Sequence, residues 1–399
     1  MMTREYSSKI TYGINVDLMW LVLSSYGFIG IFFRPIVDYL ALRLKNRKII
    51  LYSAIVIVFI SFIPFIIVQN TTTSVIQSIG IGVGASMIGM YELMFKEQYT
   101  VNKAFLTVSI LALPPLLADF LSSSIQSIVT TIPKTGYNTN YPYMYIWIIS
   151  LFFLVLTLIL LFFVKENRGL IGLKNSKNII IQNNWIAYIW YSLICVMGFL
   201  VAFIKFSNSG SVGVLTITQI NEYYKTYSSE VLEGITAYMS LLFSLFQLSS
   251  SLFIYLFVIK KDRKDILFSI GIIVWISYHL LIMFVNDSIA YFALSALNGL
   301  SYGILYNLVL GLVLTLSFNM NKITPMGIYQ GILSIGTTIS TFLVPFIKTN
   351  LTSKNQEAFT KNNYVINGIL LSLIVMLGLI YFIVGFIQHK NKEKIILNI

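Results

Sequence analysis

Apolar residues are gathered in eleven blocks long enough to cross a lipid bilayer, and this feature constrains the fold more than any other. A helix needs about 20 apolar residues to span the hydrocarbon core, and only helices or closed barrels satisfy their backbone polar groups there. The blocks are continuous rather than alternating, so we predict helices and not barrel strands. Their approximate limits are 18–42, 48–68, 74–95, 104–130, 143–164, 184–204, 234–258, 264–285, 287–317, 325–347 and 364–388.

Composition excludes most other classes of protein. Charged residues make up 11% of the chain and its mean hydropathy is +0.81, whereas soluble domains carry about 25% charged residues. A soluble enzyme or a nucleic-acid-binding domain is therefore not expected. The single cysteine, Cys195, and the two histidines exclude an internal disulfide and make a histidine-rich metal site implausible. No catalytic group, metal or cofactor is predicted, and the lack of a phosphate-binding P-loop excludes an ATP motor in this chain.

Lysine and arginine are unevenly divided between the two sides of the membrane. If the loop after the first block is cytoplasmic and the sides then alternate, cytoplasmic segments hold 18 of the 27 basic residues and external ones hold 8. Arg34 is the one remaining, inside a block. Positive charge is retained on the cytoplasmic side, so we expect a plasma-membrane protein with an external N-terminus and a cytoplasmic C-terminus.

The chain resembles itself at an offset of 216 residues. Residues 39–53 align without gaps on 255–269, and eight of the fifteen positions are identical, including much of a polar loop. One residue further along, Gly82 faces Gly299. Parallel repeats of this kind are typical of the two halves of one class of transporter. We therefore predict an N-terminal bundle at 1–164, a cytoplasmic linker at 165–183, a C-terminal bundle at 184–388 and a basic cytoplasmic tail at 389–399.

The segment Pro35–Lys48 resembles the signature of the major facilitator superfamily, which joins the second and third helices of its members. Arg43, Arg47 and Lys48 match basic positions of that signature, whereas Asp38 stands at its glycine and Leu42 at its aspartate. The resemblance implies an all-helical membrane fold of two pseudo-symmetric bundles. Family members typically have six plus six helices, but here the signature follows the first span. We expect a version of five plus six helices that lacks helix one, or a chain whose recorded start is late.

Charged residues inside or at the ends of the first and third blocks are candidates for a gate. Arg34 and Asp38 lie four residues apart, so they share one helix face, and Glu92 lies near the cytoplasmic end of its block. A charge within a span costs at least a few kcal/mol unless it is paired or hydrated. The alternative is a structural ion pair that holds two helices together. The basic residues that join the gating candidates are Arg43, Arg47 and Lys48.

Other polar residues within the blocks are candidates for proton coupling or substrate contact. Asp119 is an isolated acid whose pKa burial would raise, which suits reversible proton binding; the alternative is a carboxyl bonded to nearby serine or glutamine. His279 could relay protons or simply pack. Asn307 and Gln330 are candidates to line a central cavity, with Glu92 as a further candidate for coupling.

These observations favour a secondary active or facilitative transporter that moves a small solute across the plasma membrane by alternating access. The alternative is a non-transporting membrane scaffold or sensor with the same fold. Its partners would be a solute, protons and the lipid bilayer, not nucleic acid, and the oligomeric state is left open. We also expect a flexible external loop after residue 207. Lys205 is predicted to lie at the end of a span, which leaves only Arg34 as a basic residue inside one and so disfavours a phosphorylated substrate.

Overall fold

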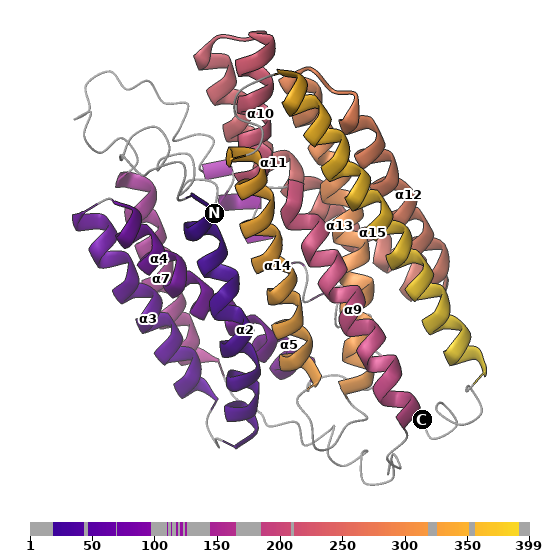
Figure 1. Cartoon of the computed structure of the whole chain (residues 1–399). Helices are drawn as coiled ribbons and strands as arrows, with labels where there is room; N and C mark the ends of the chain where they lie inside the picture. Colours follow the sequence, from indigo (N-terminus) through magenta and orange to yellow (C-terminus); the bar gives the residue numbers. More distant parts are fainter. Residues whose placement is uncertain are drawn as a thin grey trace.

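The computed structural model is an elongated bundle of helices (Figure 1). In the part of the chain that the structure describes, every regular element is helical. Nine helices there are long and apolar enough to cross a membrane. The described residues are 19–43, 47–68, 70–96, a few positions between 110 and 125, 144–164, 185–208, 211–317, 325–350 and 356–390.

Ten of the eleven predicted blocks fall on described helices, and the block at 104–130 lies largely outside the described residues. The helices before the predicted linker are α2 (Met19–Arg43), α3 (Lys48–Ile67), α4 (Thr71–Ser86), α5 (Ile88–Lys96) and α7 (Met144–Phe163). Those after it are α9 (Trp185–Asn208), α10 (Ser211–Tyr224), α11 (Ser229–Ile254) with a short π-helical extension (Tyr255–Ile259), α12 (Lys264–Met283), α13 (Ser288–Ser317), α14 (Pro325–Asn350) and α15 (Gln356–Lys390). The predicted linker and nearly all of the predicted tail lie outside the described residues.

The helices pack as two groups that α14 joins. In the first group α4 packs on α2 and α3, and α3 packs on α7. In the second group α13 packs on α11 and α12, and α15 packs on α12 and α9. Helix α14 belongs to the second half of the sequence but packs on both α2 and α9, and Figure 1 shows it between the two groups. The α2–α14 contact is therefore the main interface between the bundles.

The internal repeat is visible in the packing. Helices α3 and α12 begin and end 216 residues apart, at Lys48 and Lys264 and at Ile67 and Met283. In each half the next helix places a glycine against the backbone of an earlier helix: Gly82 of α4 lies against α2, and Gly299 of α13 lies against α11. A Cβ added at Gly82 would lie 2.7 Å from the Tyr26 carbonyl oxygen, and one at Gly299 would meet the Phe243 carbonyl oxygen. Each pair lies 217 residues from its counterpart, so both halves use the same helix contact.

The predicted flexible loop after residue 207 is wrong, because most of it is helical. Helix α10 buries Val212, Leu215, Ile217 and Ile220, an apolar pattern that short polar stretches on either side obscure. The preceding helix α9 continues to Asn208, whose carbonyl oxygen accepts hydrogen bonds from the hydroxyls of α12 and α13 tyrosines at 3.4 Å each.

Lys205 lies in the last turn of α9, and α10 continues the apolar stretch beyond it. The tyrosines bonded to Asn208 are Tyr278, about a turn and a half before the end of α12, and Tyr291, near the start of α13. Lys205 is one turn of α9 deeper than Asn208, since a helix rises about 1.5 Å per residue. It belongs to the 37-residue apolar stretch Tyr188–Tyr224.

We predict that Gly82→Ala and Gly299→Ala lower the thermal unfolding temperature of the detergent-purified protein. The added methyl groups enter space occupied by backbone, and such overpacking costs about 1–3 kcal/mol. Matched controls are Gly368→Ala and Gly378→Ala in α15, where an added Cβ meets nothing within 4 Å. Equal unfolding temperatures for all four variants would show that the repeated helix contact is not tight.

Candidate functional site

Small residues let α2 and α14 approach closely along a seam between the bundles. An added Cβ at Gly30 would lie 2.5 Å from the Ser334 hydroxyl oxygen, and one at Gly327 would lie 2.7 Å from the Asp38 Cβ. Small side chains at helix contacts are the usual means of close packing within membranes. The seam reaches the end of the molecule where α2 ends, α3 begins and α15 ends, which is the lower end in Figure 1.

Near this lower end, the side chain of Gln330 bridges two charged residues of the opposite bundle. Arg34 Nη1 donates to Gln330 Oε1 at 2.7 Å and to the Gln330 carbonyl oxygen at 3.1 Å. Gln330 Nε2 in turn donates to Glu92 Oε2 at 3.2 Å. Arg34 and Glu92 are 8% and 6% exposed. The amide thus presents its oxygen to the cation and its nitrogen to the carboxylate.

Asp38 makes a second contact across the seam. Its carboxylate accepts a hydrogen bond from the backbone N–H of Gly327, in the first turn of α14. The first N–H groups of a helix have no partner within the helix and carry partial positive charge, so a carboxylate is favoured there. Arg47 lies near enough to attract Asp38 and is itself buried, with Nε donating to the Ala41 carbonyl oxygen at 3.2 Å.

The charges of this site all come from the first bundle. Arg34, Asp38, Glu92 and Arg47 lie before the predicted linker, whereas the second bundle supplies a neutral amide, a carbonyl and a helix N-terminus. Hydrogen bonds to charged groups contribute about 1.5–3 kcal/mol each. Breaking an ion pair that crosses an interface leaves two buried charges unpaired and costs more. Here separation of the bundles would leave Arg34 and Glu92 on the same bundle.

The structure brings four of the predicted residues together across the seam, places a fifth, Arg47, beside Asp38, and separates the others. Arg34, Asp38, Glu92 and Gln330 form the cross-bundle cluster, which we call the seam cluster. The sequence suggested the first three as a group but assigned Gln330 only to a cavity. No sequence signal paired Gln330 with Arg34, since 296 residues separate them.

The remaining candidates have other surroundings. His279 is fully buried inside the second bundle, where its Nδ1 lies 2.9 Å from Asn367 Oδ1. Asn307 Nδ2 donates to the Ser250 hydroxyl at 3.3 Å, between α13 and α11. Lys48 Nζ donates to the Phe162 carbonyl oxygen at 3.3 Å and so ties α3 to α7. Asp119 and the side chain of Arg43 lie outside the described residues.

An aromatic column, which sequence reasoning missed, runs from the seam cluster towards the other end of the molecule. The rings of Tyr306 and Tyr302 lie 5.4 Å apart, and those of Tyr302 and Phe243 lie 6.2 Å apart and nearly parallel. At its lower end the Tyr306 side chain interacts with Gln330, Glu92 and Arg34. At its upper end the Lys205 ammonium lies 4.1 Å from the Tyr302 ring centroid. We call Lys205, Phe243, Tyr302 and Tyr306 the aromatic column.

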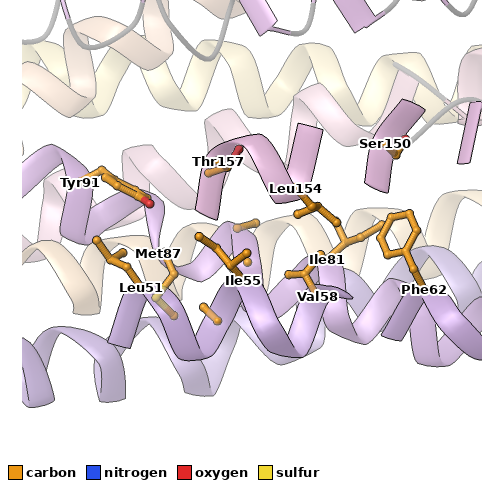
Figure 2. Close-up of a pocket in the computed structure, with 13 residues that line it drawn as sticks. Leu51, Ile55, Val58, Phe62, Ile81, Met87, Tyr91, Ser150, Leu154 and Thr157 are labelled. Carbon is orange, nitrogen blue, oxygen red and sulfur yellow. The ribbon is translucent and has the colours of Figure 1, made fainter. Parts of the chain in front are cut away.

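A separate apolar cavity of about 330 Å³ lies within the first bundle. Figure 2 shows α3 side chains such as Leu51, Ile55 and Val58 lining it opposite Leu154 of α7. Ser150 and Thr157 are among its few polar residues, and Thr157 already donates to its own helix. The cavity therefore offers little that could orient a polar solute, and its lining includes neither the seam cluster nor the aromatic column. Among the described residues, no three histidine, cysteine or acidic side chains gather where they could hold a metal ion.

Comparison with known proteins identifies the fold. No protein-family model matches the sequence, and neither does any curated protein sequence. The human organic anion transporter MFSD10 is a similar solved structure, with a TM-score of 0.61 and 10% identity over 92% of this chain and 83% of that one. The nucleoside transporter NupG is another, with a TM-score of 0.59 and 12% identity over 95% and 94%. As the segment Pro35–Lys48 predicted, the chain has the fold of the major facilitator superfamily transporters.

Proposed function

We propose that the protein moves a small solute across the plasma membrane by alternating access, with the seam cluster as the gate at its cytoplasmic end. The observation that carries the proposal is the bridge from Arg34 through Gln330 to Glu92, which joins the two bundles near the lower end. The printed descriptions of the two structural neighbours, a transporter of organic anions and one of nucleosides, support solute transport in general.

Opening of this gate follows from where the charges lie. When the bundles tilt apart, Gln330 exchanges its bonds to Arg34 and Glu92 for bonds to water entering the gap. Arg34 and Glu92 remain on one bundle and keep each other's charge compensated. Asp38 leaves the N-terminus of α14 but stays near Arg47. No isolated charge is exposed to lipid at any stage, so the barrier is set by a few hydrogen bonds.

The orientation and domain assignments form part of the same proposal. The lower end carries the basic α2–α3 and α11–α12 turns, and positive charge is retained on the cytoplasmic side. We therefore assign the lower end and the C-terminus to the cytoplasm, and the N-terminus to the exterior. The segments at 165–183 and 389–399 then act as a cytoplasmic linker and tail.

We predict that the purified protein, reconstituted in liposomes, gives saturable uptake of at least one labelled solute from a panel of sugars, amino acids, nucleosides and organic acids. Gly30→Trp, which places a large ring in the seam where Ser334 already leaves no space for a Cβ, should abolish that uptake. Gly378→Ala, in open space on α15, is the control. Absence of uptake across the whole panel would favour the scaffold or sensor alternative.

We further predict that Gln330→Leu opens the cytoplasmic end more often. The probe is Ser334→Cys in a Cys195→Ser background, because Ser334 is 2% exposed and lies one turn above Gln330. Loss of hydrogen bonds to charged groups should raise its labelling by an impermeant maleimide about tenfold in inside-out vesicles. Asn307→Leu removes an amide that bonds only within its own bundle and is the matched control. Labelling that is unchanged, or equally fast in right-side-out vesicles, would contradict the gate.

A further inference from the structure

Resting on the proposed transport function, we infer that the aromatic column is the substrate site and that it selects solutes combining an anionic group with an aromatic ring. The inference comes from the juxtaposition of a lysine in the last turn of α9 with a stack of ring faces that leads to the gate. It names a substrate class for the protein and a residue, Lys205, that determines it.

Lys205 supplies the positive charge of the proposed site. A lysine within a span is costly and usually marks a route for a substrate or ion. Its ammonium lies over three rings, at 4.1 Å from the centroid of Tyr302, 4.7 Å from Phe206 and 5.7 Å from Phe243. These rings come from α9, α11 and α13, so three helices hold the cation at one place. Ring faces attract an ammonium group and hold it in place.

The rings of the aromatic column are stacked on one another. Phe243 and Tyr302 stack at 27°, and Tyr302 and Tyr306 lie at 31°, both close to the offset parallel arrangement that aromatic pairs favour. Tyr302 is 5% exposed and partly buried Tyr306 lies next to the seam cluster. A planar solute can extend or enter such a stack, whereas a saturated ring of the same size gains less from it.

An unsatisfied polar group beside the column is an independent sign of a ligand. The Tyr329 hydroxyl is fully buried and has no hydrogen-bond partner in the part of the chain that the structure describes, although buried polar groups in folded proteins nearly always have one. It interacts electrostatically with Tyr302 and Tyr306, so it lies at the side of the column. Its ring is held against Gly198 of α9, where an added Cβ would clash with it. A bound solute with a polar substituent would supply the missing hydrogen bond.

The distribution of charge sets the sign of the solute. Lys205 stands at the upper end of the column, while at the lower end Glu92 and Arg34 are both already bonded to Gln330. A cationic solute would meet Lys205 with like charge, and a neutral one would gain no charge contact there. An anion beside Lys205 gains a charge–charge contact, which is strong in a site of low dielectric.

The test uses three matched probes on the full-length protein in detergent, with binding measured by calorimetry. Benzoate carries both the ring and the charge, benzamide lacks the charge, and cyclohexanecarboxylate lacks the aromatic ring. We expect benzoate to bind about tenfold or more tightly than either of the others. Equal binding of benzoate and benzamide, equal binding of benzoate and cyclohexanecarboxylate, or no binding of benzoate overturns the inference, and this comparison needs no variant to fold.

Variants then assign the selectivity to residues. Lys205→Gln should bring benzoate down to the affinity of benzamide, while Lys205→Arg, which keeps the charge over the rings, should retain the preference. Tyr302→Leu should remove the preference for benzoate over cyclohexanecarboxylate, and Tyr302→Phe should keep it. A preference that survives Lys205→Gln would overturn the role of Lys205.

The outcomes separate this inference from the proposed function. If benzoate does not bind but another solute of the uptake panel is transported, the transport function stands and the substrate class is wrong. If benzoate binds in the expected Lys205-dependent manner but no solute crosses the membrane, the binding site stands and the transport function is wrong.

Discussion

The protein keeps three ionisable side chains within one membrane-embedded bundle and bonds them, across the interface, to uncharged groups of the other bundle. Arg34, Asp38 and Glu92 are all nearly buried, and each would be costly in lipid without partners. Gln330 and the first turn of α14 complete their hydrogen bonding only when the bundles are together. Because compensation of charge is internal to one bundle and hydrogen bonding is shared between bundles, the interface can break without stranding a charge. The proposed gate depends on this division.

The internal repeat shows how the two halves differ. Two positions that are charged in the first half are uncharged in the second, and two positions that are aromatic in the second half are small in the first. The residue 216 positions after Arg34 is Ser250, and the residue 217 positions after Glu92 is Val309, so the second bundle lacks these charges. The residues 217 positions before Tyr302 and Tyr306 are Ala85 and Gly89, so the first bundle lacks the aromatic column. An added Cβ at Gly89 would lie 3.5 Å from Gln330 and 3.8 Å from Asp38; a tyrosine there would displace the gate. The first half thus supplies the charged residues of the seam cluster, and the second half supplies the rings of the aromatic column. Both halves have the same helical arrangement.

The sequence predicted the fold well because the bilayer imposes it. Apolar length gave helix limits within a few residues for α2, α3, α12 and α13, and the repeat gave the pairing of the halves. It failed at α10, where polar residues on both sides of a short apolar pattern suggested a loop instead of a buried helix. The site was predictable on the first bundle, since Arg34 and Asp38 are charges four residues apart. Gln330 and the aromatic column were not, because uncharged amides and tyrosines are ordinary in apolar helices and acquire meaning only from long-range packing.

Alternating access requires that one end of the molecule opens while the other closes, and this reciprocal movement can be measured. Spin labels at Ile49 and Ile266 would report the lower end, and labels at Ile67 and Phe284 the upper end, since all four side chains are well exposed and lie at or next to the corresponding ends of α3 and α12. Distances measured by double electron–electron resonance, with Cys195→Ser as background, should respond to Gln330→Leu in opposite directions. The account predicts a longer lower distance and a shorter upper one. Two distances that stay fixed, or that change in the same direction, would contradict it.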